Sequence, residues 1–168
     1  MALFLSTSIN KIDSKGRVSV PAGWRTAIAE QGVDITSASN ASRHGIFVYP
    51  SLEGATIEGG GAAWRDSIGI MLEEFDPFTQ ERALLNDAIF GRSEFLSFDG
   101  EGRVIPSPTL LDHAGIDKEI CFVGLGERFQ IWEPKAYTAT RTDVQRSEAA
   151  KLLQGLTSPA KIKRGDTQ

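Results

Sequence analysis

Two short segments of the sequence combine residue types that can bind an anionic ligand. They are Asp13-Ser14-Lys15-Gly16-Arg17 and Asp99-Gly100-Glu101-Gly102-Arg103, which share the pattern Asp-x-x-Gly-Arg at an offset of 86 residues, from 13 to 99. The planar guanidinium of Arg donates paired hydrogen bonds to phosphate oxygens or to a guanine edge. Alternatively, the Asp caps its own turn and pairs with the Arg four residues later, while Gly permits the backbone conformation. The two interpretations are compatible, because the Asp could fix the loop that presents the Arg.

The two copies of this pattern differ in charge. The first has Lys15 where the second has Glu101, and Arg25 of the segment that follows the first turn aligns with Leu111. We therefore expect the first turn to be the better anion-binding tip, with Asp13 shaping it. The candidate cations around this turn are Lys11, Lys15, Arg17 and Arg25. Arg103 is a secondary candidate, for which a structural role in its own turn is the preferred interpretation.

The elements expected around the two turns follow the same order. Around the first turn, the sequence predicts strands over residues 3–12 and 17–20 and a helix from Pro21 to Gly32. Leu3, Leu5 and Ile9 share one face of the first strand, and Trp24 and Ile28 lie one turn apart on the helix. Around the second turn, it predicts strands over 93–98 and 103–105 and a helix over 108–113. A unit that occurs twice indicates a fused pair of similar modules.

The segment between the two copies is expected to be helical. Gly59-Gly60-Gly61 is expected to break regular structure ahead of it. The first helix has one apolar stripe, ends before Asp76-Pro77, and is defined by Trp64, Ile68, Met71, Leu72 and Phe75. The second begins at the Thr79 cap, ends at Gly91, and is expected to bury Leu84, Leu85, Ala88 and Ile89.

Other parts of the chain predict additional strands and a C-terminal helix. The strands are expected at residues 34–37, 46–49, 119–123 and 129–132. The helix starts at about residue 140 and has Val144, Ala150 and Leu153 as its apolar positions. A polar tail from residue 157 is expected to be disordered.

The composition is that of an ordinary globular protein in a reducing compartment. Of 168 residues, 40% are hydrophobic, only one is Cys, and no apolar run reaches the length of about 20 residues that spans a membrane. The N-terminus lacks the features of a signal peptide, so we expect a cytoplasmic protein that does not engage a membrane. The net charge of −4 alone argues against nucleic acid. However, segments 1–25 and 149–168 each carry four Lys or Arg against one Asp, which is compatible with a localised anion-binding face or with plain scatter.

No constellation of residues favours an enzyme. His44 and His113 are the only histidines, and the single Cys121 lies in an expected strand. The sequence has no P-loop, no Gly-x-Gly-x-x-Gly after a strand, and no metal-ligand spacing. We expect no cofactor, no metal and no small-molecule substrate.

Several segments in order resemble the MraZ family of bacterial regulators. They are Asp-x-Lys-Gly-Arg-Val-x-Val-Pro from Asp13, a helix with Arg25, Phe47-Val48-Tyr49-Pro50, the second Asp-x-x-Gly-Arg, and Gly124 to Trp132. The resemblance covers residues 1–137. It implies a mixed β/α fold, mainly β, in which two tandem SpoVT/AbrB-like swapped-hairpin modules form a pseudo-dimeric β-barrel with short helices. The expected boundaries are 1–55 for the first module, 56–92 for a helical connection, 93–140 for the second module, and 141–168 for a helix and tail.

The resemblance also implies a function. It identifies the chain as a nucleoid-associated transcription factor, expected to act as a repressor of the division and cell-wall gene cluster. Its partners would be double-stranded promoter DNA with direct repeats and further copies of itself in a ring-shaped homo-oligomer. The turn from Asp13 to Arg17 would contact DNA. The stretch Ile105-Pro106-Ser107-Pro108 departs from the family pattern. We expect a shortened or bulged second hairpin, because Pro106 cannot donate to a strand ladder. The alternative is an AbrB-like, antitoxin-like module that binds a partner protein.

Overall fold

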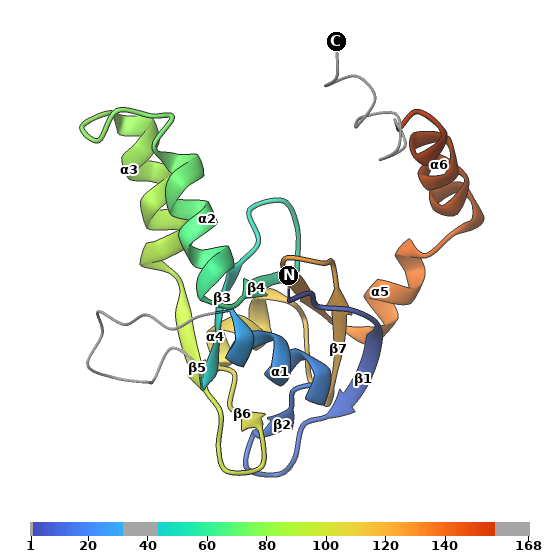
Figure 1. Ribbon diagram of the computed structural model, residues 1–168. Coiled ribbons are helices and arrows are strands. Elements are labelled where there is room, and N and C mark those ends of the chain that lie inside the picture. The colour runs from blue at the N-terminus through green and yellow to red at the C-terminus, as the bar shows by residue number, and fades with distance from the viewer. Residues whose placement is uncertain (1, 32–43, 157–168) are drawn as a thin grey trace. The chain divides into compact units, whose positions relative to one another are not determined.

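The computed structural model describes residues 2–31 and 44–156 (Figure 1). The chain divides into two compact units, Met1–Pro134 and Lys135–Gln168, which are treated separately below. Gly32, the expected strand at 34–37 and the expected tail from residue 157 lie outside the described residues.

The first unit is built on an antiparallel sheet of six strands. In spatial order these are β1 (Thr7–Lys11), β7 (Glu119–Gly124), β8 (Phe129–Trp132), β4 (Ile57–Gly60), β3 (Gly45–Pro50) and β5 (Glu94–Ser97). A separate two-stranded sheet pairs β2 (Val18–Ser19) with β6 (Arg103–Val104). The fold is therefore mixed and mainly β, as predicted.

The expected closed barrel is not found among the described strands. β1 and β5 are the two edges of the larger sheet and pair only inward, with β7 and β3. β2 and β6 are each two residues long and remain a separate sheet. Proline explains their shortness, because Pro21 and Pro106 follow shortly after them and cannot donate to a strand ladder.

The pairing pattern of the strands is the same on the two sides of the larger sheet. β1 pairs with β7 as β5 pairs with β3, and β7–β8 is matched by β3–β4. At the centre, β4 and β8 place Glu58 opposite Gln130. In the small sheet, Val18 lies opposite Val104, which are the residues that follow the Arg of each Asp-x-x-Gly-Arg segment.

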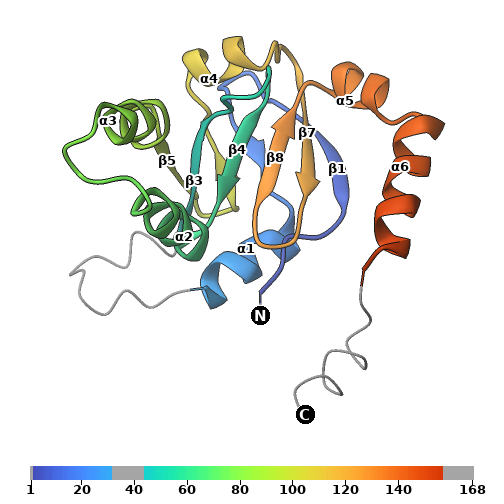
Figure 2. The ribbon, with the colours of Figure 1, turned by 90° about the horizontal axis from the view of Figure 1, so that it is seen from above.

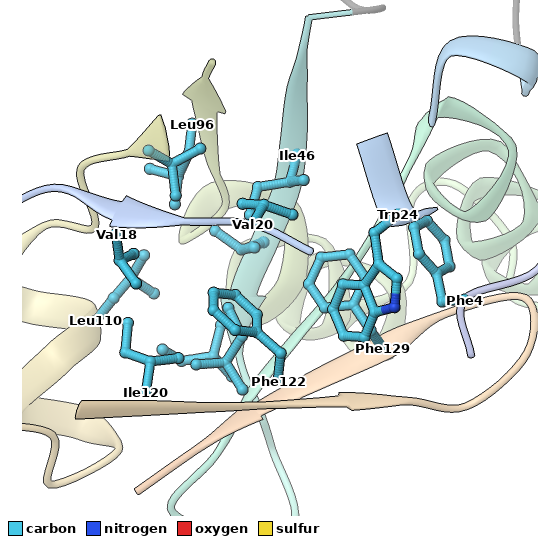
Figure 3. Packing of buried hydrophobic residues seen from close by; sticks show 14 of the residues in the cluster. Phe4, Val18, Val20, Trp24, Ile46, Leu96, Leu110, Ile120, Phe122 and Phe129 are labelled. Atoms are coloured by element: carbon cyan, nitrogen blue, oxygen red, sulfur yellow. The ribbon is translucent and has the colours of Figure 1, made fainter. Parts of the chain in front are cut away.

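The main core lies between the large sheet and the elements that follow the two turns (Figure 3). Those elements are β2 and β6 with the helices α1 (Ala22–Glu30) and α4 (Pro108–His113). Trp24 of α1 is 3% exposed, and its ring meets those of Phe4 and Phe122 edge-on at 5.5 and 5.6 Å. Its indole Nε1 donates to Leu5 O at 2.8 Å, so the core fixes the position of α1.

A second cluster covers the other face of β3. It is formed with α2 (Ala62–Leu72), α3 (Gln80–Asn86) and the π-helical segment η2 (Asp87–Gly91), which lie beside β3 and β5 at one end of the sheet (Figure 2). The predicted stripe of α2 is confirmed for Trp64, Ile68 and Leu72, which are buried. Met71 and Phe75 are exposed instead, because Met71 lies outside the buried face of α2 and Phe75 follows the end of that helix.

The predicted helix from Thr79 to Gly91 forms, but its burial differs. The Thr79 hydroxyl caps α3 by accepting from Arg82 N, as expected, and Ile89 is buried. Leu84 is 63% exposed, so the expectation that it is buried is wrong. The change from α3 to the π-helical turn of η2 alters the register of side chains along the segment, so a regular helical stripe does not apply.

The prediction that Gly59-Gly60-Gly61 breaks regular structure is wrong for its first two residues. Gly59 and Gly60 form part of the buried strand β4. A Cβ on Gly59 would lie 2.5 Å from the Phe129 ring, and one on Gly60 would lie 2.6 Å from Trp64 Cβ. Glycine is used here for close packing rather than for a bend.

The predicted strand over residues 3–12 is also shorter than expected. Ser6 adopts a φ of +72°, and β1 begins only at Thr7. Phe4 is fully buried, whereas Leu3, Leu5 and Ile9, the predicted apolar face, are all exposed. The left-handed residue interrupts the alternation of faces on which the prediction depended.

Up to residue 156, the second unit is formed by the helices α5 (Pro134–Thr140) and α6 (Asp143–Gln154). The Thr142 hydroxyl accepts from Gln145 N and caps α6, which confirms a helix carrying Val144, Ala150 and Leu153. Its start is three residues later than predicted, and α5 was not expected. Val144 and Leu153 are exposed.

Candidate nucleic-acid interface

The first Asp-x-x-Gly-Arg segment forms a turn organised by Asp13. Oδ1 of Asp13 accepts from the backbone N–H groups of Lys15 and Arg17 at 2.9 and 2.8 Å. Oδ2 accepts from Arg17 Nε at 2.7 Å, and Gly16 N donates to Asp13 O at 3.0 Å. Gly16 has a φ of +79°, which glycine adopts without strain. The predicted turn and its Asp–Arg pair are confirmed.

The second segment repeats this arrangement. Asp99 Oδ1 accepts from the backbone N–H groups of Glu101 and Arg103, both at 2.9 Å. Asp99 Oδ2 accepts from Arg103 Nε at 2.8 Å, and Gly102 has a φ of +77°. The two turns therefore have the same internal hydrogen bonds despite different intervening residues.

These hydrogen bonds also set the charge state of the turns. The backbone N–H of Arg17 is the main cause that lowers the pKa of Asp13, and that of Arg103 does the same for the pKa of Asp99. The side-chain bond to Asp99 raises the pKa of Arg103 further above its already high value. Both Asp side chains are thus charged at neutral pH.

The two turns lie side by side beyond β2 and β6 (Figure 1). Val20 N donates to Gly102 O at 3.2 Å, and Ser19 lies opposite Arg103 in the strand pair. Asn10, just before the first turn, donates from Nδ2 to Ser19 O at 2.7 Å. The pair of turns is therefore one surface, supplied by segments far apart in the sequence.

The two Arg side chains differ in how much of the guanidinium is engaged. Arg17 is bonded through Nε alone, and its two Nη groups have no hydrogen bond or ion pair with the described residues. Nη1 of Arg103 instead lies 3.4 Å from Glu101 Oε2 and 4.0 Å from Asp13 Oδ2. Arg17 thus keeps its outer donors for a ligand, while Arg103 is surrounded by carboxylates.

The other candidate cations lie around this surface. Lys15 at the turn tip and Lys11 at the end of β1 are exposed and form no ion pair with the part of the chain that the structure describes. Arg25 is half-buried, and its side chain lies against Gly102 of the second turn. The structure therefore brings Lys15 and Arg17 together at the first turn, and Arg25 and Arg103 at the second. Lys11 lies at the end of β1, just before the first turn.

Sequence reasoning missed two contributors to this surface. The Arg25 side chain lies against Gly102, and the Asn10 side chain bonds β1 to β2. Glycine at this position was explained by its own turn, and nothing in the sequence indicated that a side chain from the first copy would cover it. The Asn10 bond depends on a pairing of strands that spacing alone does not reveal.

The other polar groups of the described residues give weaker candidates for a functional site. Buried Glu58 accepts from Arg128 Nη1 at 3.0 Å and from Gln130 Nε2 at 2.9 Å, so that network satisfies itself. His113 Nε2 lies 3.0 Å from Gly54 O, and Cys121 is buried in β7. Within residues 2–31 and 44–156, no cluster of three metal-ligating side chains occurs. In the same residues, no helix is long and apolar enough to cross a membrane.

Comparison with known proteins gives a consistent family. Residues 89–154 match the family model described as "MraZ protein, putative antitoxin-like". A "Transcriptional regulator MraZ" from Rickettsia bellii (strain OSU 85-389) is 40% identical over 154 residues, which cover 91% of this chain and 96% of that protein. The protein of the same name from Parvibaculum lavamentivorans is 44% identical, over 87% of this chain and 85% of that protein. The chain belongs to the MraZ family of transcriptional regulators.

Proposed function

We propose that this chain regulates transcription by binding double-stranded DNA through the turn from Asp13 to Arg17. The observation that carries the proposal is the state of Arg17, whose Nε is held by Asp13 while both Nη groups are unengaged by described residues. A guanidinium fixed at Nε presents its outer edge in one orientation, which suits bidentate contact with a phosphate or with guanine O6 and N7. Lys15 and Lys11 add exposed positive charge beside it.

The charges of the two turns support a division of roles. The first turn has Lys15 and Arg17 against Asp13, a net charge of +1, and the second has Arg103 against Asp99 and Glu101, a net charge of −1. Phosphate attracts the first and repels the second. Lys11, Asp13, Lys15, Arg17 and Arg25 form the proposed DNA-binding set, and Arg103 contributes mainly to its turn.

The proposal includes two tandem SpoVT/AbrB-like modules, over 1–55 and 93–140, that pair as a pseudo-dimer. The matching strand pairs on either side of β4–β8 support it, as does the pairing of β2 with β6 across the two copies. Residues 56–92 would connect the modules, and 141–168 would form a C-terminal extension. On this proposal, the cationic first turn contacts DNA, and the second turn lies beside it.

One turn of net charge +1 binds DNA weakly, so we infer that the protein acts as an assembly. A ring of copies would present repeated turns to repeated promoter sites, and the affinities would multiply. The exposed apolar side chains of Leu5, just before the edge strand β1, and of Ile9 within it are compatible with contact between copies. The regulated genes would be those of division and the cell wall, with the protein acting as a repressor in the cytoplasm, on the nucleoid.

A second candidate function is binding of a partner protein, as in an antitoxin. The observation that favours it is the exposed apolar surface of the α2–α3 hairpin, where Phe78 is fully exposed and Ile70 is 67% exposed. Such a protein would not need free cations at the turns.

A band-shift titration separates the two functions. The wild-type protein is expected to retard DNA from upstream of its own gene, with an affinity that falls as salt rises. Absence of salt-dependent binding near physiological ionic strength contradicts the DNA proposal and leaves protein binding as the alternative. Light scattering on the same sample reports the size of the assembly.

A further inference from the structure

We propose that Gly102 of the second turn is a positioning residue for Arg25 of the first module. In this role, the second turn contributes to DNA binding without contacting DNA, by holding a cation of the first module in place. The inference rests on the proposed DNA-binding function and adds to it a role for a residue that carries no charge.

The contact between Gly102 and Arg25 is so close that a side chain at residue 102 would displace Arg25 from its present position. A Cβ placed on Gly102 would lie 2.5 Å from both Cδ and Cζ of Arg25. Real side chains do not approach so closely, so Arg25 can occupy this place only because residue 102 is glycine. Gly102 is buried, whereas Gly16, its counterpart in the first turn, is only partly buried.

The surroundings of Arg25 show that packing, rather than a salt bridge, holds it. Arg25 Nε is buried and has no hydrogen-bond partner among the described residues. The backbone of α1 fixes the start of the side chain, since the neighbouring Trp24 is anchored in the core. The position of the guanidinium is therefore set by α1 at one end and by the surface of the second turn at the other.

The contact between Gly102 and Arg25 has no equivalent at the matching positions, Gly16 and Leu111. A Cβ on Gly16 would meet Ile105 Cγ2 at 3.7 Å, an ordinary contact, and no Arg of the described residues, apart from its own chain neighbour, lies within 4 Å of that Cβ position. Leu111, the counterpart of Arg25, instead packs against the main core. The second turn thus lies against a cation of the first module. The second module has Leu111 at the matching position, so it has no such cation to place against the first turn.

A link between the turns adds to this support. Val20 N donates to Gly102 O at 3.2 Å, so the residue under Arg25 is bonded to the strand that leads into α1. Gly102, β2 and α1 therefore hold Arg25 between them, and a shift of the second turn displaces Arg25 relative to Arg17. The expected result of such a shift is weaker DNA binding with the charge of the protein unchanged.

The test is a double-mutant cycle on DNA affinity. We expect G102A to weaken binding about tenfold in the wild-type background and to have little further effect when combined with R25A, because both changes remove the same positioned group. G115A is the matched control: Gly115 also has a positive φ, of +64°, but nothing lies within 4 Å of its Cβ position. Additive effects of G102A and R25A, or an equal loss in G115A, overturn the inference.

Two further measurements keep the inference testable if G102A does not fold. R25K retains the charge but lacks the planar group that rests on Gly102, so we expect it to bind DNA as weakly as R25A. Full binding by R25K overturns the inference. In DNA-free protein, the NMR signal of Arg25 Nε–Hε is expected to shift in G102A and to stay unchanged in G115A. If the wild type fails to bind DNA, both the proposed function and the positioning role of Gly102 are contradicted. If the wild type binds DNA but G102A and R25A have additive effects, only the positioning role is contradicted.

Discussion

Arg103 of the second turn reaches Asp13 of the first, with Nη1 at 4.0 Å from Oδ2. Asp13 is at the same time the residue that orders the first turn and holds Arg17 through Nε. Two copies of one motif are therefore linked by an electrostatic contact across the β2–β6 pair. This contact brings a cation of the second turn within 4.0 Å of the Asp that orders the first turn.

The charge of the second turn predicts a gain-of-function substitution. Glu101→Lys removes the carboxylate that lies 3.4 Å from Arg103 and places a Lys where the first turn has Lys15. We expect tighter DNA binding and a steeper dependence of affinity on salt, by about one additional counterion. The measurement is a salt titration of binding by fluorescence anisotropy. Glu127→Lys, the same charge change at an exposed residue of the β7–β8 loop, is the control; equal gains in both variants would show only a net-charge effect.

The low pKa values of Asp13 and Asp99 predict how stability depends on pH. Because each folded-state pKa lies below the unfolded value of about 3.9, each carboxylate stabilises the fold above that pH. This stabilisation is lost as the pH falls through the folded pKa. Titration of the carboxyl carbons by NMR is expected to give midpoints below those of unfolded peptides. Asp13→Asn is expected to reduce the loss of stability on acidification; ordinary midpoints in the wild type would contradict the hydrogen-bonded turn.

Gly60 of β4 and Gly69 of α2 predict opposite effects of substitution by Ala. Gly60→Ala places a Cβ 2.6 Å from Trp64, and overpacking of this kind destabilises by about 1–3 kcal/mol. Gly69→Ala, in the middle of α2 with nothing within 4 Å, is expected to stabilise by up to about 1 kcal/mol through helix propensity. Denaturant unfolding measures both. A neutral Gly60→Ala would mean that β4 and α2 are less closely packed than described.

Local patterns allowed much of this fold to be predicted. The two turns, the strands at 46–49, 119–123 and 129–132, and the Thr79 cap depend on neighbouring residues, and the structure confirms them. Gly59 and Gly60 were misread because a glycine required by a distant Trp or Phe has the same appearance as one required by a bend. The positive φ of Ser6 has no signal in the sequence, so the sequence predicts a longer N-terminal strand than the one that forms.

The sequence identified the residues of the candidate site but not how they come together in space. The cations could be identified from the difference between the copies, since Lys15 and Glu101 occupy matching positions. Their grouping depends on the pairing of β2 with β6, which joins residues that are far apart in the chain. The cover that Arg25 provides for Gly102, and the reach of Arg103 to Asp13, follow from that pairing alone.

The comparison of Arg17→Ala with Arg103→Ala tests the central claim most directly. Both variants lose one Arg from equivalent turns, so net charge and composition stay matched. Binding to DNA from upstream of the gene is measured by anisotropy, and folding by thermal unfolding. We expect Arg17→Ala to lose at least about tenfold in affinity, as for one bidentate contact, with little change in thermal stability. Arg103→Ala is expected to lower thermal stability and to change affinity much less. Equal losses of affinity in the two variants, without any effect on folding, would contradict the division of roles between the turns.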